Sequence, residues 1–537
     1  MSRRLISIVL AGLLGAIVFA ADRAKTLQPE FQTSDRCVAC HNGLITASGL
    51  DASIGFAWRA TMMANSSRDP YWQGSVRRET LDHTESAAAI EDECSICHMP
   101  ITRYEAKLRG EHGRVFAHLP FVADDQEGRQ AADGVSCSVC HQISTERLGT
   151  RESFTGGFVV QPPSTPDARP EYGPFEVEAG HRRIMLSSSE GYRPTQSMHI
   201  RDSELCATCH TLITQALGPD GKVVGSLPEQ VPYQEWLHSD YKGMQSCQSC
   251  HMPEVTEPAP ATRVFGEPHD GLRRHTFVAA NFFMLQMLNR YRDALDVAAL
   301  PQELSSGATD TVAFLQSRAA TIRVDNVAVV GDRLRAEVAV ENLGGHKLPT
   351  AYPSRRAWLH VVVRDSNSRV VFESGAVRPD GSVAGNDNDA DASRFEPHYT
   401  EITSADQVQI YESILGDRNG AVTTGLLNGV RYLKDNRLLP RGFDKKTADA
   451  EVAVHGGAVD DPDFTAGGDR VRYTIPLNGA SAPYTVTAEL LYQPIGFRWA
   501  NNLKAYDAAE PRRFTSYYDA MAGATTTTLA RASVTGR

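Results

Sequence analysis

Cys37-Val-Ala-Cys40-His41 is the first of five copies of one pattern, in which two cysteines are separated by two residues and followed by histidine. The other copies are Cys94-Ser-Ile-Cys97-His98, Cys137-Ser-Val-Cys140-His141, Cys206-Ala-Thr-Cys209-His210 and Cys247-Gln-Ser-Cys250-His251. This spacing places two thiols on one side of a short helical turn, where they can bond to the two vinyl groups of haem, with the imidazole at the iron. The sequence therefore predicts five c-type haems. Their proximal iron ligands would be His41, His98, His141, His210 and His251.

Other uses of these cysteines fit the pattern less well. The five motifs consume all ten cysteines of the chain, which leaves none for a disulfide framework. A four-cysteine zinc site would need motifs to combine in pairs, and five is an odd number. A thioredoxin-like pair needs a βαβ context, which the surrounding sequence lacks. The irregular spacing of the motifs predicts a loop-rich, mainly helical domain in which the porphyrins form much of the core.

The N-terminus has the pattern of a secretory signal peptide, predicted over residues 1–21. Arg3 and Arg4 precede an apolar stretch over residues 5–20, and small residues follow at the expected cleavage point. The alternative is an uncleaved anchor, but this stretch is short for a hydrocarbon layer of about 30 Å. We therefore expect a periplasmic or extracellular protein without a transmembrane segment in the mature chain. The net charge of −11 argues against nucleic acid and permits redox protein partners.

Each iron needs a sixth ligand or an open position. The first candidates are His199, just before the fourth motif, and His275, after the fifth. Met63 follows the first motif in a helix-like stretch, and a methionine ligand would raise the potential of its haem. His346 lies in a Gly-Gly turn between expected strands. For each candidate the alternative is an ordinary packing or hydrogen-bonding role. The remaining candidates are His118, His181 and His238.

The sequence after His275 changes character. Residues 281–299 are apolar at helical spacing, and several short alternating segments follow from about residue 319. The expected strands are residues 321–330, 334–340, 357–364, 370–374, 471–476 and 485–492. The fold class predicted is therefore α+β and multidomain, with a β-sandwich-like C-terminal domain. The expected domains are residues 22–278 with five haems, a helical connector over 279–318 and the β domain over 319–537.

An acidic stretch interrupts the expected strands at residues 380–391. It crowds carboxylates and amides into a loop with glycine, which would suit a calcium-like cation with oxygen ligands. It does not match the EF-hand pattern, and a solvated acidic loop is the favoured alternative. Residues 460–463 are a weaker version of the same composition.

The motifs resemble those of bacterial multihaem cytochromes related to the tetrahaem cytochromes of ammonia oxidisers. The resemblance rests on Ser-Glu-Leu before Cys206 and on Cys247-Gln-Ser-Cys-His-Met-Pro253. In that group a Trp-x-x-Ser-x-His-Ala segment supplies a distal histidine, and Trp58-Arg-Ala-Thr-Met-Met-Ala64 is similar with Met63 in that place. Gly345-His-Lys-Leu-Pro-Thr350 resembles a stretch of attached β domains, which favours His346 as a ligand. The resemblance implies electron transfer and names no substrate.

Three functions follow from these expectations. The favoured one is an electron carrier, because all five motifs end in histidine and enough residues are present to fill the sixth positions. The second is an oxidoreductase with one open haem that converts a small nitrogen or sulfur compound. Pentahaem nitrite reductases, however, place a lysine where all five motifs here have histidine. The third is a docking role for the β domain, which is compatible with the first. No catalytic residue is assigned.

Overall fold

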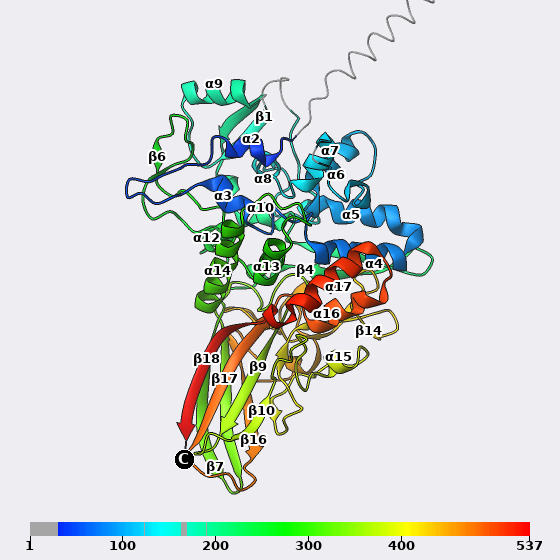
Figure 1. The fold of residues 1–537 in the computed structure, drawn as a ribbon, viewed down its shortest axis with the longest axis vertical. Coiled ribbons are helices and arrows are strands. Elements are labelled where there is room, and N and C mark those ends of the chain that lie inside the picture. The colour runs from blue at the N-terminus through cyan, green and yellow to red at the C-terminus, as the bar shows by residue number, and fades with distance from the viewer. Residues whose placement is uncertain (1–30, 123, 163–168, 190, 537) are drawn as a thin grey trace, which may run out of the picture.

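The computed structural model describes residues 31–122, 124–162, 169–189 and 191–536, so the predicted signal peptide lies outside the described part. A helical, loop-rich part holds the five motifs, and long strands extend from it toward the C-terminus (Figure 1). The predicted α+β class is confirmed. The helices of the motif part are α2 (Ser34–Val38), α3 (Ile54–Arg59), α4 (Pro70–Asp82), α5 (Ala87–His98), α6 (Pro100–Leu108), α7 (Gln126–Ala132), α8 (Cys137–Gln142), α9 (Ala179–Ser188), α10 (Ser203–Ala207), α11 (Pro232–Leu237) and α12 (Cys247–His251).

Small two-stranded sheets connect these helices. They are the parallel pair β1 (Arg169–Gly173) and β2 (Tyr192–Gln196), and the antiparallel pairs β3 (Leu212–Leu217) with β4 (Val223–Gln230) and β5 (Ala259–Pro260) with β6 (Pro268–His269). Two further helices, α13 (Phe282–Arg290) and α14 (Pro301–Arg318), lead out of the motif part. Phe282, Phe283 and Leu288 of α13 are buried in the core cluster that continues into the strands.

The C-terminal strands form two main sheets that make the predicted sandwich-like domain. One has the order β10 (Val370–Ser374), β9 (Arg356–Arg364), β17 (Tyr484–Gln493) and β18 (Thr527–Gly536), with β12 (Ile410–Tyr411) also on β9. The other has the order β11 (Glu401–Ile402), β16 (Gly468–Pro476), β8 (Arg333–Asn342) and β7 (Ala320–Val330). Along β8 buried residues alternate with more exposed ones, as expected for a sheet with one face in the core.

Several C-terminal elements carry no clear signal in the sequence. A third sheet consists of β14 (Val422–Thr423), β13 (Ser413–Gly416) and β15 (Arg431–Asp435). The helices α15 (Asp387–Ala390), α16 (Phe497–Asn502) and α17 (Ala509–Met521) interrupt or follow the strands. In Figure 1 α17 lies beside α4 of the motif part, and Arg77 Nε is 2.9 Å from Glu510 Oε2. The two halves of the chain are therefore joined by more than one contact.

Among the described residues, none of the helices combines the length and apolar character needed to cross a bilayer.

Candidate functional site

All five motifs open onto one cavity of about 2450 Å³ in the helical part. Its lining includes all ten cysteines and all five motif histidines. Ordinary ligand pockets measure roughly 300–1,000 Å³, so this cavity is large enough for several big prosthetic groups. None of the ten cysteines forms a disulfide. The donors and the space therefore fit the predicted set of covalent haems.

Each motif lies in or at the end of a short helical turn, as the spacing predicts. In α8 and α12 the motif begins at the first residue of the helix, and in α5 it forms the last turn. Elsewhere the turn is closed by His41 N–H to Cys37 O (3.1 Å) and by His210 N–H to Cys206 O (2.9 Å). The two thiols and the imidazole are thus held on one rigid turn.

Four motif histidines donate Nδ1–H to a backbone carbonyl. The acceptors are the carbonyls of Ala261 for His41 (2.6 Å), Ser66 for His98 (2.9 Å), Tyr172 for His141 (2.6 Å) and Val278 for His251 (2.6 Å). A carbonyl can only accept, so the proton is on Nδ1 and the lone pair is on Nε2. Such bonds fix the orientation of a ligating imidazole. These histidines are therefore prepared to bind iron through Nε2.

Two predicted sixth ligands lie opposite motif histidines. The ring centres of His141 and His275 are 6.3 Å apart with planes 17° from parallel, and those of His251 and His346 are 6.2 Å apart at 8°. An iron between two imidazoles needs about 2 Å for each metal–nitrogen bond and roughly 1.1 Å from each nitrogen to its ring centre, so the centres lie roughly 6 Å apart. Both pairs have this separation. The structure thus brings together the third motif with His275 and the fifth with His346.

Burial keeps these imidazoles neutral. It lowers the pKa of His98 and His251 to about 4 each and the pKa of His275 to about 3. At neutral pH these rings therefore carry the free lone pair that a metal requires.

Thiols of different motifs lie close together in three places. Cys37 and Cys137, Cys97 and Cys209, and Cys206 and Cys247 are near enough to shift one another's pKa. The first motif therefore adjoins the third, and the fourth adjoins both the second and the fifth. Cys140 of the third motif also interacts electrostatically with Cys206 and Cys209 of the fourth. The fourth motif is thus the neighbour of three others.

The remaining sixth-ligand candidates divide into two groups. Met63 and His181 line the cavity, and His181 Nδ1 lies 3.8 Å from Glu178 Oε2. His199, His238 and His118 are not among its lining residues.

The second group lies away from the cavity and makes its contacts elsewhere. His199 is buried, its Nδ1 is bonded to the Ser197 hydroxyl (2.6 Å) and its Nε2 to the Ile143 carbonyl (2.8 Å), and its role as an iron ligand stays a prediction. His238 Nδ1 donates to Gln234 O and its Nε2 lies 3.4 Å from Asp449 Oδ2, so its ligand role likewise stays a prediction. His118 lies among charged side chains on the short turn Phe116–His118.

The cavity also holds buried acids that the sequence analysis did not single out. Glu79 accepts from the N–H of Leu426 (2.9 Å), and Glu229 accepts from the Thr214 hydroxyl (2.6 Å). Burial raises the pKa of Glu79, and it raises that of Glu229 to about 7. Both carboxyls interact electrostatically with Cys94 of the second motif. Glu79 and Glu229 are far apart in the sequence, and neither lies in a motif. The sequence therefore gives no sign that they are neighbours.

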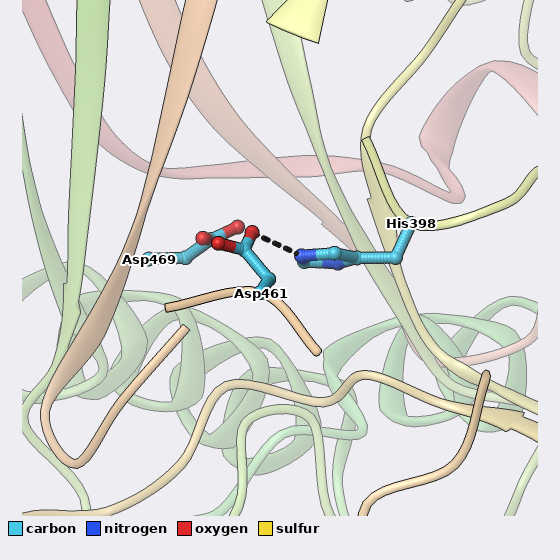
Figure 2. Close-up of side chains that lie close together, drawn as sticks. All are labelled: His398, Asp461 and Asp469. Carbon is cyan, nitrogen blue, oxygen red and sulfur yellow. Dashed lines mark hydrogen bonds and ion pairs between the residues drawn. The ribbon is translucent and has the colours of Figure 1, made fainter. Parts of the chain in front are cut away.

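A second cluster lies in the β domain, where His398 points toward Asp461 and Asp469 (Figure 2). His398 Nε2 is 2.9 Å from Asp461 Oδ2, while its Nδ1 faces the amide nitrogens of Gln409 (2.9 Å) and Asn436 (3.0 Å). The oxygens of both amides accept backbone N–H groups, so their nitrogens must donate to Nδ1. The proton is therefore on Nε2, which donates to Asp461 and has no lone pair for a metal. This cluster is a complete hydrogen-bond network.

In the acidic stretch over residues 380–391, which was expected to suit calcium, carboxylates bind donor groups of the protein. Asp389 makes a bidentate pair with Arg356 (2.8 and 2.9 Å) and accepts Val383 N–H. Asp387 pairs with Arg394, and Asp391 accepts from Ser393. The carboxylates therefore do not converge on one point in this loop.

Comparisons with known proteins bear on the fold. No family model matches the sequence, and no curated protein matches it. A crystal structure of a penta-heme cytochrome c552 from Thermochromatium tepidum is similar, with a TM-score of 0.54 and 16% identity over 95% of this chain and 100% of that chain. Over nearly its whole length, this chain therefore has the fold of that penta-heme cytochrome.

Proposed function

We propose that this chain is a pentahaem c-type cytochrome that relays electrons between redox partners. The observation that carries the proposal is the convergence of five C-x-x-C-H motifs on one cavity, with two motif histidines each facing a second imidazole at the separation of a six-coordinate iron. The shared fold with a penta-heme cytochrome supports it. Covalent haem supplies the one-electron chemistry when it is bound. The protein supplies attachment, axial ligands and a cavity large enough for the porphyrins.

The contacts between motifs support a relay. Thiols that lie close together across motifs would bring the edges of their porphyrins together, since each thiol is bonded to a porphyrin edge. The first motif adjoins the third, and the fourth adjoins the second, third and fifth. The proposed path therefore runs from the first site through the third to the fourth, where it branches to the second and fifth.

The cellular setting belongs to the same proposal. Haem attachment in bacteria takes place outside the cytoplasm, which agrees with the signal peptide expected over residues 1–21. We therefore propose a periplasmic or extracellular protein with redox protein partners and no nucleic acid. The relationship to the tetrahaem cytochromes of ammonia oxidisers is part of the proposal and rests on the motifs already described.

Reductive titration of the purified holoprotein tests the relay. The protein should accept five electrons per chain and should pass them to an oxidised soluble cytochrome without any small substrate. A protein whose haems do not reoxidise with a protein acceptor, but turn over with a small nitrogen or sulfur compound, would contradict the relay.

One observation favours the second function, an oxidoreductase with an open haem. Glu79 and Glu229 are buried acids beside Cys94, and Tyr71 and Tyr352 line the same cavity. Groups of this kind can donate protons to a bound substrate. Binding of carbon monoxide to the reduced wild-type protein at one haem, lost or altered in Glu229→Gln, would favour this alternative.

A further inference from the structure

The residue opposite the fifth motif, His346, comes from a loop of the β domain. The loop begins at Asn342, the last residue of β8, and runs to Thr350. Asn342 closes it from within, because its amide donates to the carbonyl of His346 (2.8 Å) and accepts the N–H of Gly344 (2.8 Å). Gly345 lies against the motif part, where an added Cβ would be 3.3 Å from the Tyr241 ring and 3.4 Å from Trp236. The loop is therefore fitted closely to the motif part.

One carboxylate of the motif part binds this loop on both sides of Leu348. Glu235 lies on α11, ahead of the fifth motif, and is completely buried. Its Oε2 accepts the backbone N–H of Lys347 (3.1 Å) and the hydroxyl of Thr350 (2.5 Å). Lys347 directly follows His346, so this bond fixes the backbone beside the imidazole.

The same carboxylate is anchored from behind by a buried charge cluster. Glu235 Oε1 is 2.9 Å from Arg437 Nη1, and Arg437 makes two bonds to Asp435 (2.8 and 2.7 Å). Lys347 Nζ lies 2.8 Å from the same Asp435 and donates to the Ala453 carbonyl (3.2 Å). Two cations and two anions therefore balance one another without solvent. Glu235 Oε1 is held by this ion pair with Arg437 and accepts no hydrogen bond from the described residues.

We propose that Glu235 is the positioning residue for the sixth ligand of the fifth site, holding the His346 loop of the β domain opposite His251. The inference rests on the proposed function. Glu235 and the fifth motif both belong to the motif part of the chain. The carboxylate therefore fixes the position of the His346 loop relative to His251. In Glu235→Gln a single oxygen replaces two, so it can accept either from the loop donors, Lys347 N–H and the Thr350 hydroxyl, or from Arg437. The loop is then no longer anchored to the charge cluster, and the β domain no longer fixes His346.

The test uses holoprotein variants, with carbon monoxide binding to the reduced protein and the spin state of the oxidised protein as readouts. His346→Ala should add one carbon-monoxide-binding haem per chain to the wild-type number. Glu235→Gln should add a measurable fraction of one such haem, and the double variant should add no more than His346→Ala alone. Exogenous imidazole should restore the low-spin signal in His346→Ala.

Glu412→Gln is the matched control, because Glu412 is a buried carboxylate paired with Lys434 (3.0 Å) that does not touch the loop. It should lower stability without changing the spin state. If His346→Ala opens a haem and Glu235→Gln does not, the positioning role is overturned. If His346→Ala opens none, the ligand assignment in the proposed function fails. If Glu235→Gln does not accumulate, Thr350→Val serves instead, because it removes one of the two bonds between Glu235 and the loop. Thr350→Val should give a smaller high-spin fraction than His346→Ala. The absence of any high-spin haem in Thr350→Val would overturn the proposal.

Discussion

Substitution of Asp435 by asparagine should strongly destabilise the β domain. Asp435 is buried and accepts from Lys347 (2.8 Å) and Arg437 (2.7 and 2.8 Å), so its neutral replacement leaves two buried cations facing only Glu235. Removal of one partner from a buried pair costs about 3–5 kcal/mol, because the other charge stays desolvated and uncompensated. With roughly 2–4 °C per kcal/mol for a domain of this size, the unfolding midpoint should fall by roughly 6–20 °C.

The stability lost in Asp435→Asn should depend on pH in one direction only. Burial alone would raise the pKa of Asp435, but Arg437 and Lys347 hold that pKa well below its usual range. Since the unfolded value is about 3.9, the stabilisation is complete above about pH 4 and is lost only as the pH falls through the folded pKa. The difference between wild type and Asp435→Asn should therefore be constant from pH 5 to 8 and shrink in acid.

Urea unfolding of the holoprotein, followed by the circular dichroism of its β-sheet, measures this difference. Lys347→Met combined with Asp435→Asn removes one cation with one anion and leaves the Arg437–Glu235 pair neutral, so the double variant should recover about 2 kcal/mol or more. Asp391→Asn is the exposed control and should change little. A loss below about 1 kcal/mol for Asp435→Asn, or a double variant less stable than the single one, would refute the reasoning.

Three further predictions concern the cavity. His275→Ala should convert one low-spin haem to high spin in the electron paramagnetic resonance spectrum, whereas His199→Ala should convert none, and the opposite result would reverse the two assignments. Glu229 has a pKa raised by burial to about 7, so its ionisation above that pH adds negative charge and should lower the potential of one haem as pH rises from 6 to 8. The slope should not exceed about 59 mV per unit for one electron, and it should vanish in Glu229→Gln; an unchanged slope would exclude Glu229 as the source. Met63→His should markedly lower one potential in a spectroelectrochemical titration, because a methionine ligand raises it, and an unchanged set of potentials would remove Met63 as a ligand.

The elements that carry local patterns could be predicted from the sequence. The C-x-x-C-H spacing fixes the motif turns, and the apolar alternation from residue 321 onward predicts β7, β8 and β9 within one or two residues. The sequence predicts His275 and His346 as ligands because each stands in a distinctive local context, and the structure places each opposite a motif histidine. The helix α17 and the strand β18 have no comparably clear pattern.

The partners of these residues depend on contacts distant in sequence. Nothing near His199 indicates that its Nε2 is bonded to the carbonyl of Ile143, which lies in another segment. The buried grouping of Glu79 with Glu229 depends on the fold in the same way. Periodicity reports the face on which a side chain lies and not its distant neighbours, so these sites required the structure.

The number of covalent haems per chain tests the central claim most directly. The protein should be expressed with its own N-terminus in a host that matures c-type cytochromes, and its intact mass should be compared with its pyridine haemochrome absorbance. Five haem additions on one polypeptide, with Cys→Ser substitution in any one motif reducing the number to four, is the predicted result. A ratio other than five, or a disulfide or zinc ion at any of the five motifs, would contradict the account.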